Sequence, residues 1–213
     1  MVNMTKEKTQ NDIVYKLISS PKKRISIFRE IPANKQGFIL LSLSKRLQQG
    51  IIDGLNDKEL IELVDYLDPD KATDLLRNTN IHRRGKIIRK LNKDRKEKVE
   101  FLLKFNPRTA AGVMSLDYIT TDKNTTFEEI SQIIWKHEKA TGKFPTVLVV
   151  ENGFLIGELL GYILALHKGK EKIKNYIKKV PHIKYNKDEN EVIEVFKKHP
   201  HNKIIVLDED GSI

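Results

Sequence analysis

Two aspartates four residues apart, Asp70 and Asp74, come nearest in type and spacing to a binding site. Within a helix, residues at positions i and i+4 project from the same face, so the spacing predicts two neighbouring carboxylates. Carboxylate oxygens are the ligands that hard cations prefer. A purely structural alternative exists, because an acidic residue in the first turn of a helix, as Asp70 would be, also favours the helix dipole.

The remaining residues offer no catalytic arrangement. The chain has no cysteine, which excludes disulfides, thiolate zinc sites and cysteine nucleophiles. Its six histidines are scattered apart from the short pair His199 and His201, so they do not form the ligand spacing of a transition-metal site. Neither a glycine-rich phosphate loop nor a Ser/His/Asp arrangement is present. We therefore expect that the protein is not an enzyme and has no catalytic residue.

Composition predicts a soluble chain of one large domain or two small ones. Of the 213 residues, 39% are hydrophobic and 32% are charged, which is enough apolar material to fill a core. No stretch approaches the roughly 18 consecutive apolar residues of a membrane helix. The net charge is +10. Such a charge fits lysine-decorated solvated faces, an anionic membrane surface or nucleic acid, and the charge alone does not choose among them.

Between residues 33 and 104 the chain repeats with a period of twelve residues. A leucine marks the period, with Thr79 in one slot: Leu43, Leu55, Leu67, Leu91 and Leu103. The residue that follows is short and polar: Ser44, Asn56, Asp68, Asn80 and Asn92. Such residues end one helix and cap the next. Because one short helix cannot bury its apolar face alone, the repeat predicts a stacked helical superhelix.

After Phe105 the pattern changes to strands and helices. The predicted order is strand, helix, strand, turn, strand, helix, and it then begins again but is incomplete at Ile213. Ile130, Ile133, Ile134 and His137 are expected to line one face of the first helix. The predicted segments are strand 118–121, a helix capped by Thr125 or Thr126, strand 146–150, turn 151–153, strand 154–157, helix 159–166, strand 182–185, helix 188–198, strand 203–207 and turn 208–211.

This order of parts, together with several short motifs, resembles a known family. The motifs are FREIP at 28–32, LDPDKATDLL at 67–76, the junction AGVM at 111–114, Asp117-Tyr118, VVENG at 149–153 and VLDEDG at 206–211. Helical repeats followed by such a junction and paired β-α-β-β-α units resemble the cytosolic portion of the MgtE magnesium transporters. In that family a superhelical N domain precedes a tandem CBS pair.

The resemblance implies an α+β fold, with an N-terminal all-α superhelix of short helical repeats followed by an α/β CBS-type domain. The domain bounds that we expect are an N-terminal helix or extension at 1–24, an MgtE-N-like repeat domain at 25–112, a first CBS motif at 113–172 and an incomplete second CBS motif at 173–213.

The resemblance also implies a function, namely a cytosolic magnesium-sensing and gating region of a magnesium transporter. Mg²⁺ is the implied cofactor, and it would bridge the N domain and the CBS domain to favour the closed pore. Asp70 and Asp74 fall on the family's N-domain acidic pair, and Asp188 falls on an acidic position at the start of the second CBS helix. Manganese or cobalt can occupy similar oxygen sites.

The implied partners are a second copy of the chain in a homodimer and a transmembrane pore domain of the same longer chain. The implied location is the cytoplasmic side of the cell membrane, where an anionic membrane surface is a further possible partner. No cofactor-binding residues are expected for a nucleotide. In the family, a pattern that corresponds to 157–163 here holds the ribose of a nucleotide through a Ser or Thr and an Asp. In this sequence Leu160 stands at the Ser/Thr position and Ile163 at the Asp position, so neither can bind the ribose.

The sequence departs from a typical magnesium sensor in one repeat, which is strongly cationic. Residues 81–92 carry Arg83, Arg84, Lys86, Arg89 and Lys90. This leaves an alternative function: a stand-alone soluble CBS-containing regulatory protein that binds nucleic acid or an acidic partner through its basic superhelix. Nucleic acid is the less expected partner, since base-stacking aromatics are missing and binding would be purely electrostatic. A CBS-type enzyme regulator is a third alternative.

Overall fold

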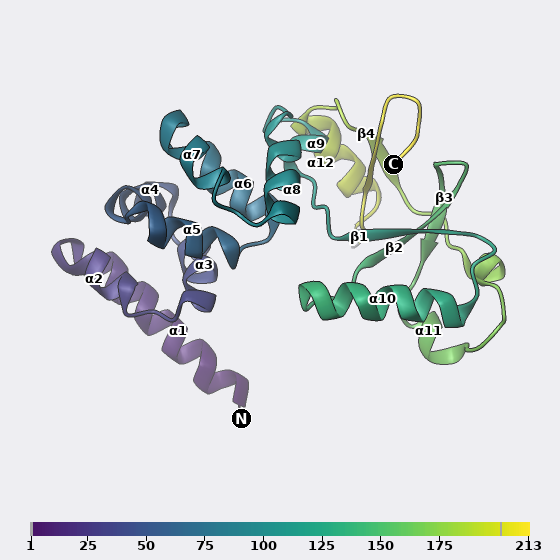
Figure 1. Cartoon of the computed structure of the whole chain (residues 1–213), viewed down its shortest axis with the longest axis horizontal. Helices are drawn as coiled ribbons and strands as arrows, with labels where there is room; N and C mark the ends of the chain where they lie inside the picture. The colour runs from purple at the N-terminus through teal and green to yellow at the C-terminus, as the bar shows by residue number, and fades with distance from the viewer. Residues whose placement is uncertain (1, 201) are drawn as a thin grey trace. The chain divides into compact units, whose positions relative to one another are not determined.

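The computed structural model describes residues 2–200 and 202–213, which divide into two compact units, Met1–Lys104 and Phe105–Ile213 (Figure 1). The first unit is entirely helical, and the second contains all of the described strands. The predicted α+β fold class is therefore confirmed. The finer domain bounds expected from the sequence stay a prediction.

In the helical unit, a long helix and a short one precede a regular array. Helix α1 (Val2–Ser19), the 3-10 turn η1 (Pro21–Lys23) and α2 (Arg24–Arg29) come first. The first residues of the next six helices lie twelve positions apart: α3 (Ala33–Ser42), α4 (Lys45–Gly54), α5 (Asp57–Asp65), α6 (Pro69–Arg77), α7 (Ile81–Ile88) and α8 (Lys93–Leu103). The predicted helical repeat is confirmed.

The residues that mark the repeat have the roles that their types predict. Leu43, Leu55, Leu67, Thr79 and Leu91 are all buried, with exposed fractions of 4 to 7%. The residue after each is the N-cap of the next helix. The side chains of Asn56, Asn80 and Asn92 accept a hydrogen bond from a backbone N–H in the first turn. A buried marker followed by a cap thus ends one helix and begins the next.

Two arginines at equivalent positions tie α7 and α8 to the helix three repeats earlier. Arg83 donates from Nη1 to the carbonyl of Ile52 at 2.9 Å and from Nη2 to that of Leu55. Arg95 donates from Nη1 to the carbonyls of Val64 and Leu67. The last carbonyls of a helix have no partner within it. These arginines therefore cap the ends of α4 and α5, and are not free surface charges.

We predict that Arg83→Ala lowers the free energy of unfolding of the helical unit by about 1–3 kcal/mol, because hydrogen bonds from a charged donor to carbonyls are lost. Its ion pair with Asp57, at 2.8 Å, adds little, since surface pairs contribute at most about 1 kcal/mol. Urea unfolding followed by far-UV circular dichroism measures the loss. Arg84→Ala, on the neighbouring residue, is the control and should shift the midpoint little. Equal shifts for the two variants would contradict the capping role.

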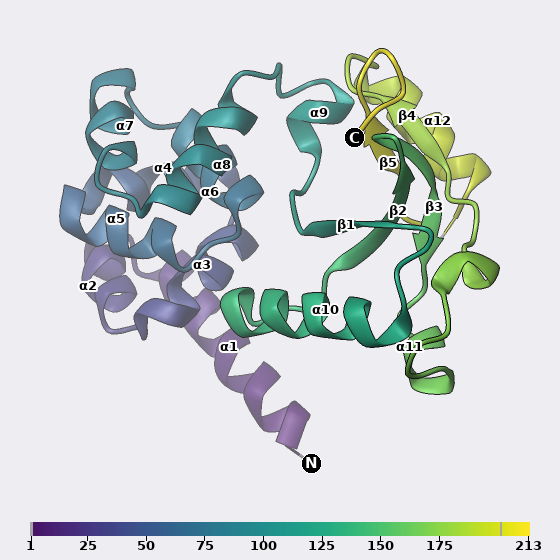
Figure 2. The same ribbon diagram turned by 45° about the vertical axis from the view of Figure 1, so that its right-hand side comes forward.

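The second unit contains a β-α-β arrangement twice (Figure 2). Strands β1 (Tyr118–Asp122) and β2 (Thr146–Glu151) are parallel and are connected by α10 (Phe127–Thr141), and β3 (Phe154–Leu159) adds antiparallel to β2. Strands β4 (His182–Lys184) and β5 (Ile205–Leu207) are parallel and are connected by α12 (Glu189–Lys198). The remaining elements are α9 (Ala110–Val113), α11 (Ile163–Leu166) and the 3-10 turn η2 (Ile173–Tyr176). The predicted repetition of one α/β unit is confirmed.

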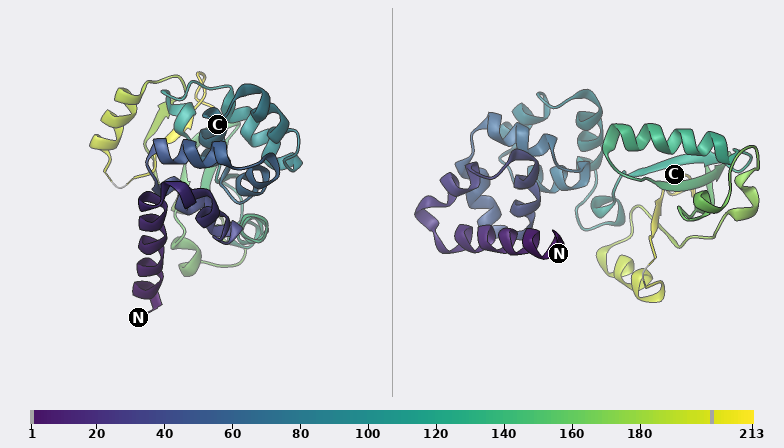
Figure 3. Two further views of the ribbon diagram at one scale, coloured as in Figure 1. Left: turned by 90° about the vertical axis from the view of Figure 1, so that its left-hand side faces the viewer. Right: turned by 90° about the horizontal axis from the view of Figure 1, so that it is seen from below.

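Helix α10 covers one face of the β1–β2 sheet (Figure 3), and its sequence explains its limits. Thr126 and Glu129 form a capping box at its start, and Gly142 ends it with a φ of 73°. Ile130 and Ile134 are buried in the core. Ile133, which was expected on the same face, is 38% exposed, so that prediction is wrong. A single residue step turns the helix far enough to move Ile133 out of the narrow buried stripe.

A second prediction, a helix at 159–166, is also wrong. Strand β3 continues to Leu159, which pairs with Val147, and only Ile163–Leu166 is helical. Glu158 exchanges backbone hydrogen bonds with Lys178 at 2.8 and 2.9 Å, so pairing on both sides holds this segment extended. The predicted turn at 151–153 is confirmed, with φ of 53° at Asn152 and 86° at Gly153. None of the described helices is both long and apolar enough to cross a bilayer.

Candidate functional site

Asp70 and Asp74 lie one turn apart on α6, as their spacing predicts. Both are half-buried, and the side chain of Asp70 is 18% exposed. The opposite side of the helix is buried in the core through Ala72, Leu75 and Leu76. Pro69 at the first helical position fixes where α6 begins, and this places Asp70 in the first turn. The two carboxylates therefore border the core on one side of a short, well-anchored helix.

The carboxylate of Asp70 has one described cationic partner, since its Oδ2 lies 3.3 Å from Nζ of Lys71. The side chain of Lys71 is 49% exposed, so this ion pair is screened by water and weak. Two like charges at i and i+4 repel each other modestly on a helix. A divalent cation would replace the Lys71 ammonium and relieve that repulsion, so the residues present fit a hydrated Mg²⁺.

Asp188 lies in the second unit and is the N-cap of α12. Its Oδ1 accepts hydrogen bonds from the backbone N–H groups of Asn190 and Glu191, at 2.9 and 3.0 Å. Glu191 completes a capping box and bonds to Lys187 at 2.7 Å; this side-chain hydrogen bond, followed by the backbone N–H of Asp188, lowers the pKa of Glu191. Both bonds to Asp188 end on the same oxygen. The structural role of Asp188 thus occupies Oδ1, and Oδ2 is the atom that could bind a metal.

The segment that follows the helical repeats holds the start of α12 in place. The backbone N–H of Ala110 donates to the carbonyl of Lys187 at 2.8 Å, and that of Ala111 donates to Tyr185 at 3.0 Å. Thr109 forms a β-bridge with Asp188. Sequence reasoning identified this junction by its motif but not by this role. Its partners lie more than seventy residues further along the chain, which no local pattern could indicate.

Within the described residues there is no cluster of three or more His, Cys, Asp or Glu side chains able to hold a metal. The structure brings Asp70 and Asp74 together on one helix of the helical unit, and it places Asp188 in the α/β unit. The assignment of these three residues to a metal stays a prediction.

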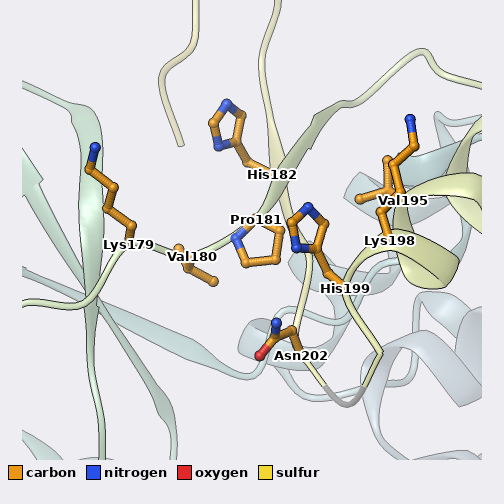
Figure 4. A pocket seen from close by; sticks show the side chains of 8 residues that line it. All are labelled: Lys179, Val180, Pro181, His182, Val195, Lys198, His199 and Asn202. Atoms are coloured by element: carbon orange, nitrogen blue, oxygen red, sulfur yellow. The ribbon is translucent and has the colours of Figure 1, made fainter.

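Sequence reasoning missed a pocket of about 420 Å³ between β4 and α12 (Figure 4). Its lining combines imidazole, ammonium and apolar groups and, among the described residues, includes no carboxylate: Lys179, Val180, Pro181, His182, Val195, Lys198, His199 and Asn202. The histidines are seventeen residues apart in sequence and meet only because the strand and the helix end are adjacent. Such a lining attracts anions electrostatically.

In the segment at 157–163, Gly157, Leu159 and Ile163 are buried, whereas Tyr162 is exposed. Gly157 belongs to β3 with a φ of 158°, and a Cβ there would lie 2.4 Å from the carbonyl of Lys178. Ile163 is 7% exposed and packs in the same cluster as Phe127 and Ile130. Leu160 and Ile163, which stand at the ribose-binding positions of the family's pattern, therefore pack in the hydrophobic core.

The chain is similar to known proteins in sequence over its helical unit and in fold over nearly all of its length. The family model described as the MgtE intracellular N domain matches residues 8–108. Among curated proteins no match was found. The crystal structure of the cytosolic domain of the Mg²⁺ channel MgtE in complex with ATP is similar, with a TM-score of 0.84 and 20% identity, over 95% of this chain and 84% of that chain. The crystal structure of the soluble part of a magnesium transporter has a TM-score of 0.66 and 16% identity, over 97% of this chain and 92% of that one.

The structural matches, at this level of identity, establish a shared fold that covers nearly the whole chain. The family match comes from the sequence of the helical unit. Its twelve-residue repeat, buried leucine markers and Asn caps all lie within the matched residues. The model of the MgtE intracellular N domain thus matches residues 8–108 of this chain, which make up nearly all of its helical unit.

Proposed function

We propose that this chain is the cytosolic magnesium-sensing and gating region of a magnesium transporter. The observation that carries the proposal is the family match of the helical unit at 8–108, which is joined directly to a repeated β-α-β unit. The fold of the whole chain is that of the cytosolic domain of a Mg²⁺ channel, which supports the same conclusion. A homodimer, a membrane pore domain as partner and a location on the cytoplasmic face belong to the proposal.

Asp70 and Asp74 of the helical unit and Asp188 of the α/β unit are the proposed ligands. Mg²⁺ supplies a hard, compact positive charge that keeps several waters and tolerates only a few protein carboxylates. In its absence, Asp70 pairs with Lys71 and the two carboxylates of α6 repel each other. In its presence, carboxylates of both units share one counter-charge, which favours a compact arrangement and, through it, the closed pore.

No group in this proposal makes or breaks a covalent bond, so the protein acts as a regulator and not as an enzyme. Its response depends on weak binding. A site of two or three partly solvated carboxylates binds Mg²⁺ weakly enough to empty when the cellular concentration falls, because most of the ligands of the ion remain water.

A magnesium titration tests the proposal. We expect the radius of gyration of the 213-residue chain, measured by small-angle scattering, to fall as Mg²⁺ rises through the millimolar range. The ionic strength is held constant with a monovalent salt, since screening alone alters repulsion between surface charges. A radius that is unchanged across this range, or that changes equally with the monovalent salt, would show that the chain does not sense magnesium.

A further inference from the structure

The end of helix α7, the turn after it and the first residue of α8 present a cationic surface, which we call the basic face: Lys86, Arg89, Lys90 and Lys93. All four residues are exposed. We propose that the basic face binds an anionic lipid surface. The proposal rests on the proposed function to the extent that a transporter region lies next to a membrane.

Charge is unevenly distributed over the repeats. The positive charge of the chain is therefore not explained by lysines spread evenly over its solvent-exposed surface. The repeat at 81–92 has five Lys or Arg residues and no Asp or Glu, a net charge of +5. The repeat at 57–68 has five acidic residues and one Lys, a net charge of −4. Because both repeats have the same length and helical form, their common architecture does not explain the difference. A surface selected for an anionic partner does.

The folded structure does not use the charges of the basic face. Arg83 belongs to the same repeat but caps the end of α4, and Arg95 caps α5. Further along α8, Lys98 pairs with Asp94 at 2.9 Å and Lys96 lies 4.0 Å from Glu100. None of the four basic-face residues forms a salt bridge with a described carboxylate. Their charges are therefore available to a partner.

The four residues lie within positions 86–93, which include the end of α7, the turn after it and the start of α8. Between them, Ile87 and Ile88 are 0 and 8% exposed and anchor the end of α7 in the core. Near the start of the same helix, Ile81 is 67% exposed. A short surface segment that carries several exposed cations and an exposed apolar side chain suits the boundary between lipid headgroups and acyl chains.

Lipid fits this surface better than single-stranded nucleic acid does. Single-stranded nucleic acids are gripped by aromatic side chains on which bases stack, and residues 81–98 contain no Phe, Tyr or Trp. An anionic headgroup layer needs only positive charge that can approach it, and each Lys or Arg close to the layer strengthens binding. The basic face supplies the charge, and residues 81–98 supply no aromatic ring on which a base could stack.

Sedimentation with vesicles tests the proposal on the 213-residue chain near physiological salt and without Mg²⁺. We expect binding to phosphatidylcholine vesicles that contain phosphatidylglycerol and none to phosphatidylcholine alone. The triple variant Lys86→Gln, Arg89→Gln and Lys90→Gln should lower the partition coefficient by roughly a hundredfold, given about a fivefold effect for each charge. The matched control, Lys168→Gln, Lys170→Gln and Lys174→Gln, removes three exposed charges from the α/β unit and should change binding far less.

Three outcomes would overturn the proposal: wild type that ignores anionic vesicles, equal losses in both triple variants, or tighter binding to duplex DNA than to vesicles at the same salt. The last outcome would assign the surface to nucleic acid. Magnesium-dependent compaction, measured on both triple variants, separates the two proposals. If the basic-face triple variant no longer binds vesicles but still compacts with Mg²⁺, the lipid proposal is supported and the magnesium-sensing proposal is unaffected. If the chain binds anionic vesicles but does not compact with Mg²⁺, only the magnesium-sensing proposal is refuted.

Discussion

Replacing both Asp70 and Asp74 with alanine should remove most of the Mg²⁺-dependent compaction and raise its midpoint by roughly tenfold or more, since even partners that only orient a ligand are worth about that factor in metal affinity. Both must be changed, because the two carboxylates lie one turn apart on α6 and either alone could still hold a hydrated ion. Small-angle scattering during a magnesium titration measures the midpoint.

The double variant should fold normally, which makes the test clean. Removing two repelling charges at i and i+4 recovers about 0.2–0.5 kcal/mol. Losing the favourable contact of Asp70 with the helix dipole costs about 0.3–1 kcal/mol. The two effects nearly cancel, so far-UV circular dichroism should be unchanged. A lost magnesium response can then be assigned to the carboxylates and not to unfolding.

A control removes two carboxylates from exposed positions elsewhere on the helical unit, Glu62→Ala with Glu97→Ala, and should leave the midpoint unchanged. In the α/β unit, Asp188→Asn preserves the N-cap, because Asn caps about as well as Asp, and removes only the charge. It should shift the midpoint in the same direction as the α6 variant. If the α6 double variant responds like the control, Asp70 and Asp74 are structural residues and the ligands lie elsewhere.

The helical unit could be predicted from the sequence because its rules are local. A buried leucine marker and a capping Asn, as at Leu55 and Asn56, stand side by side in the chain and act within one turn of each other. The same applies to the candidate site. Asp70 and Asp74 share a face because helical spacing alone determines it, and no tertiary contact is needed.

Features that depend on distant partners escaped prediction. From the sequence, Gly157 was expected to end a strand. The strand continues to Leu159, and Gly157 lies so close to the backbone carbonyl of Lys178 that a Cβ there would clash. Arg83 reads as one more surface cation, although the carbonyl that it caps belongs to Leu55, twenty-eight residues earlier. The pocket that contains His182 and His199 exists only once β4 and α12 are adjacent. In each case the deciding contact is made by residues that are far apart in sequence.

Gly112→Ala should destabilise the α/β unit by about 2–3 kcal/mol, the cost of overpacking at a close backbone contact. A Cβ at this position would lie 2.0 Å from the carbonyl oxygen of Asn106 and 2.7 Å from Cα of Pro107. Both are backbone atoms, so no side chain can turn aside to make room. The junction must shift instead, and it carries the hydrogen bonds from Ala110 and Ala111 to the second β-α-β unit. The single tryptophan, Trp135, lies on α10 and reports unfolding of this unit in urea.

Gly85→Ala is the matched control, since Gly85 lies within α7 and a Cβ there would meet nothing within 4 Å. Neither Gly112 nor Gly85 has a positive φ, so the two positions differ in the space around them and not in backbone conformation. Alanine at position 85 should stabilise the helical unit by up to about 1 kcal/mol through its higher helix propensity. That change should be visible in far-UV circular dichroism, with little effect on Trp135 fluorescence. If Gly112→Ala left the fluorescence midpoint unchanged, the close approach of Asn106 would be unnecessary for stability, and the glycine of the junction would need another explanation.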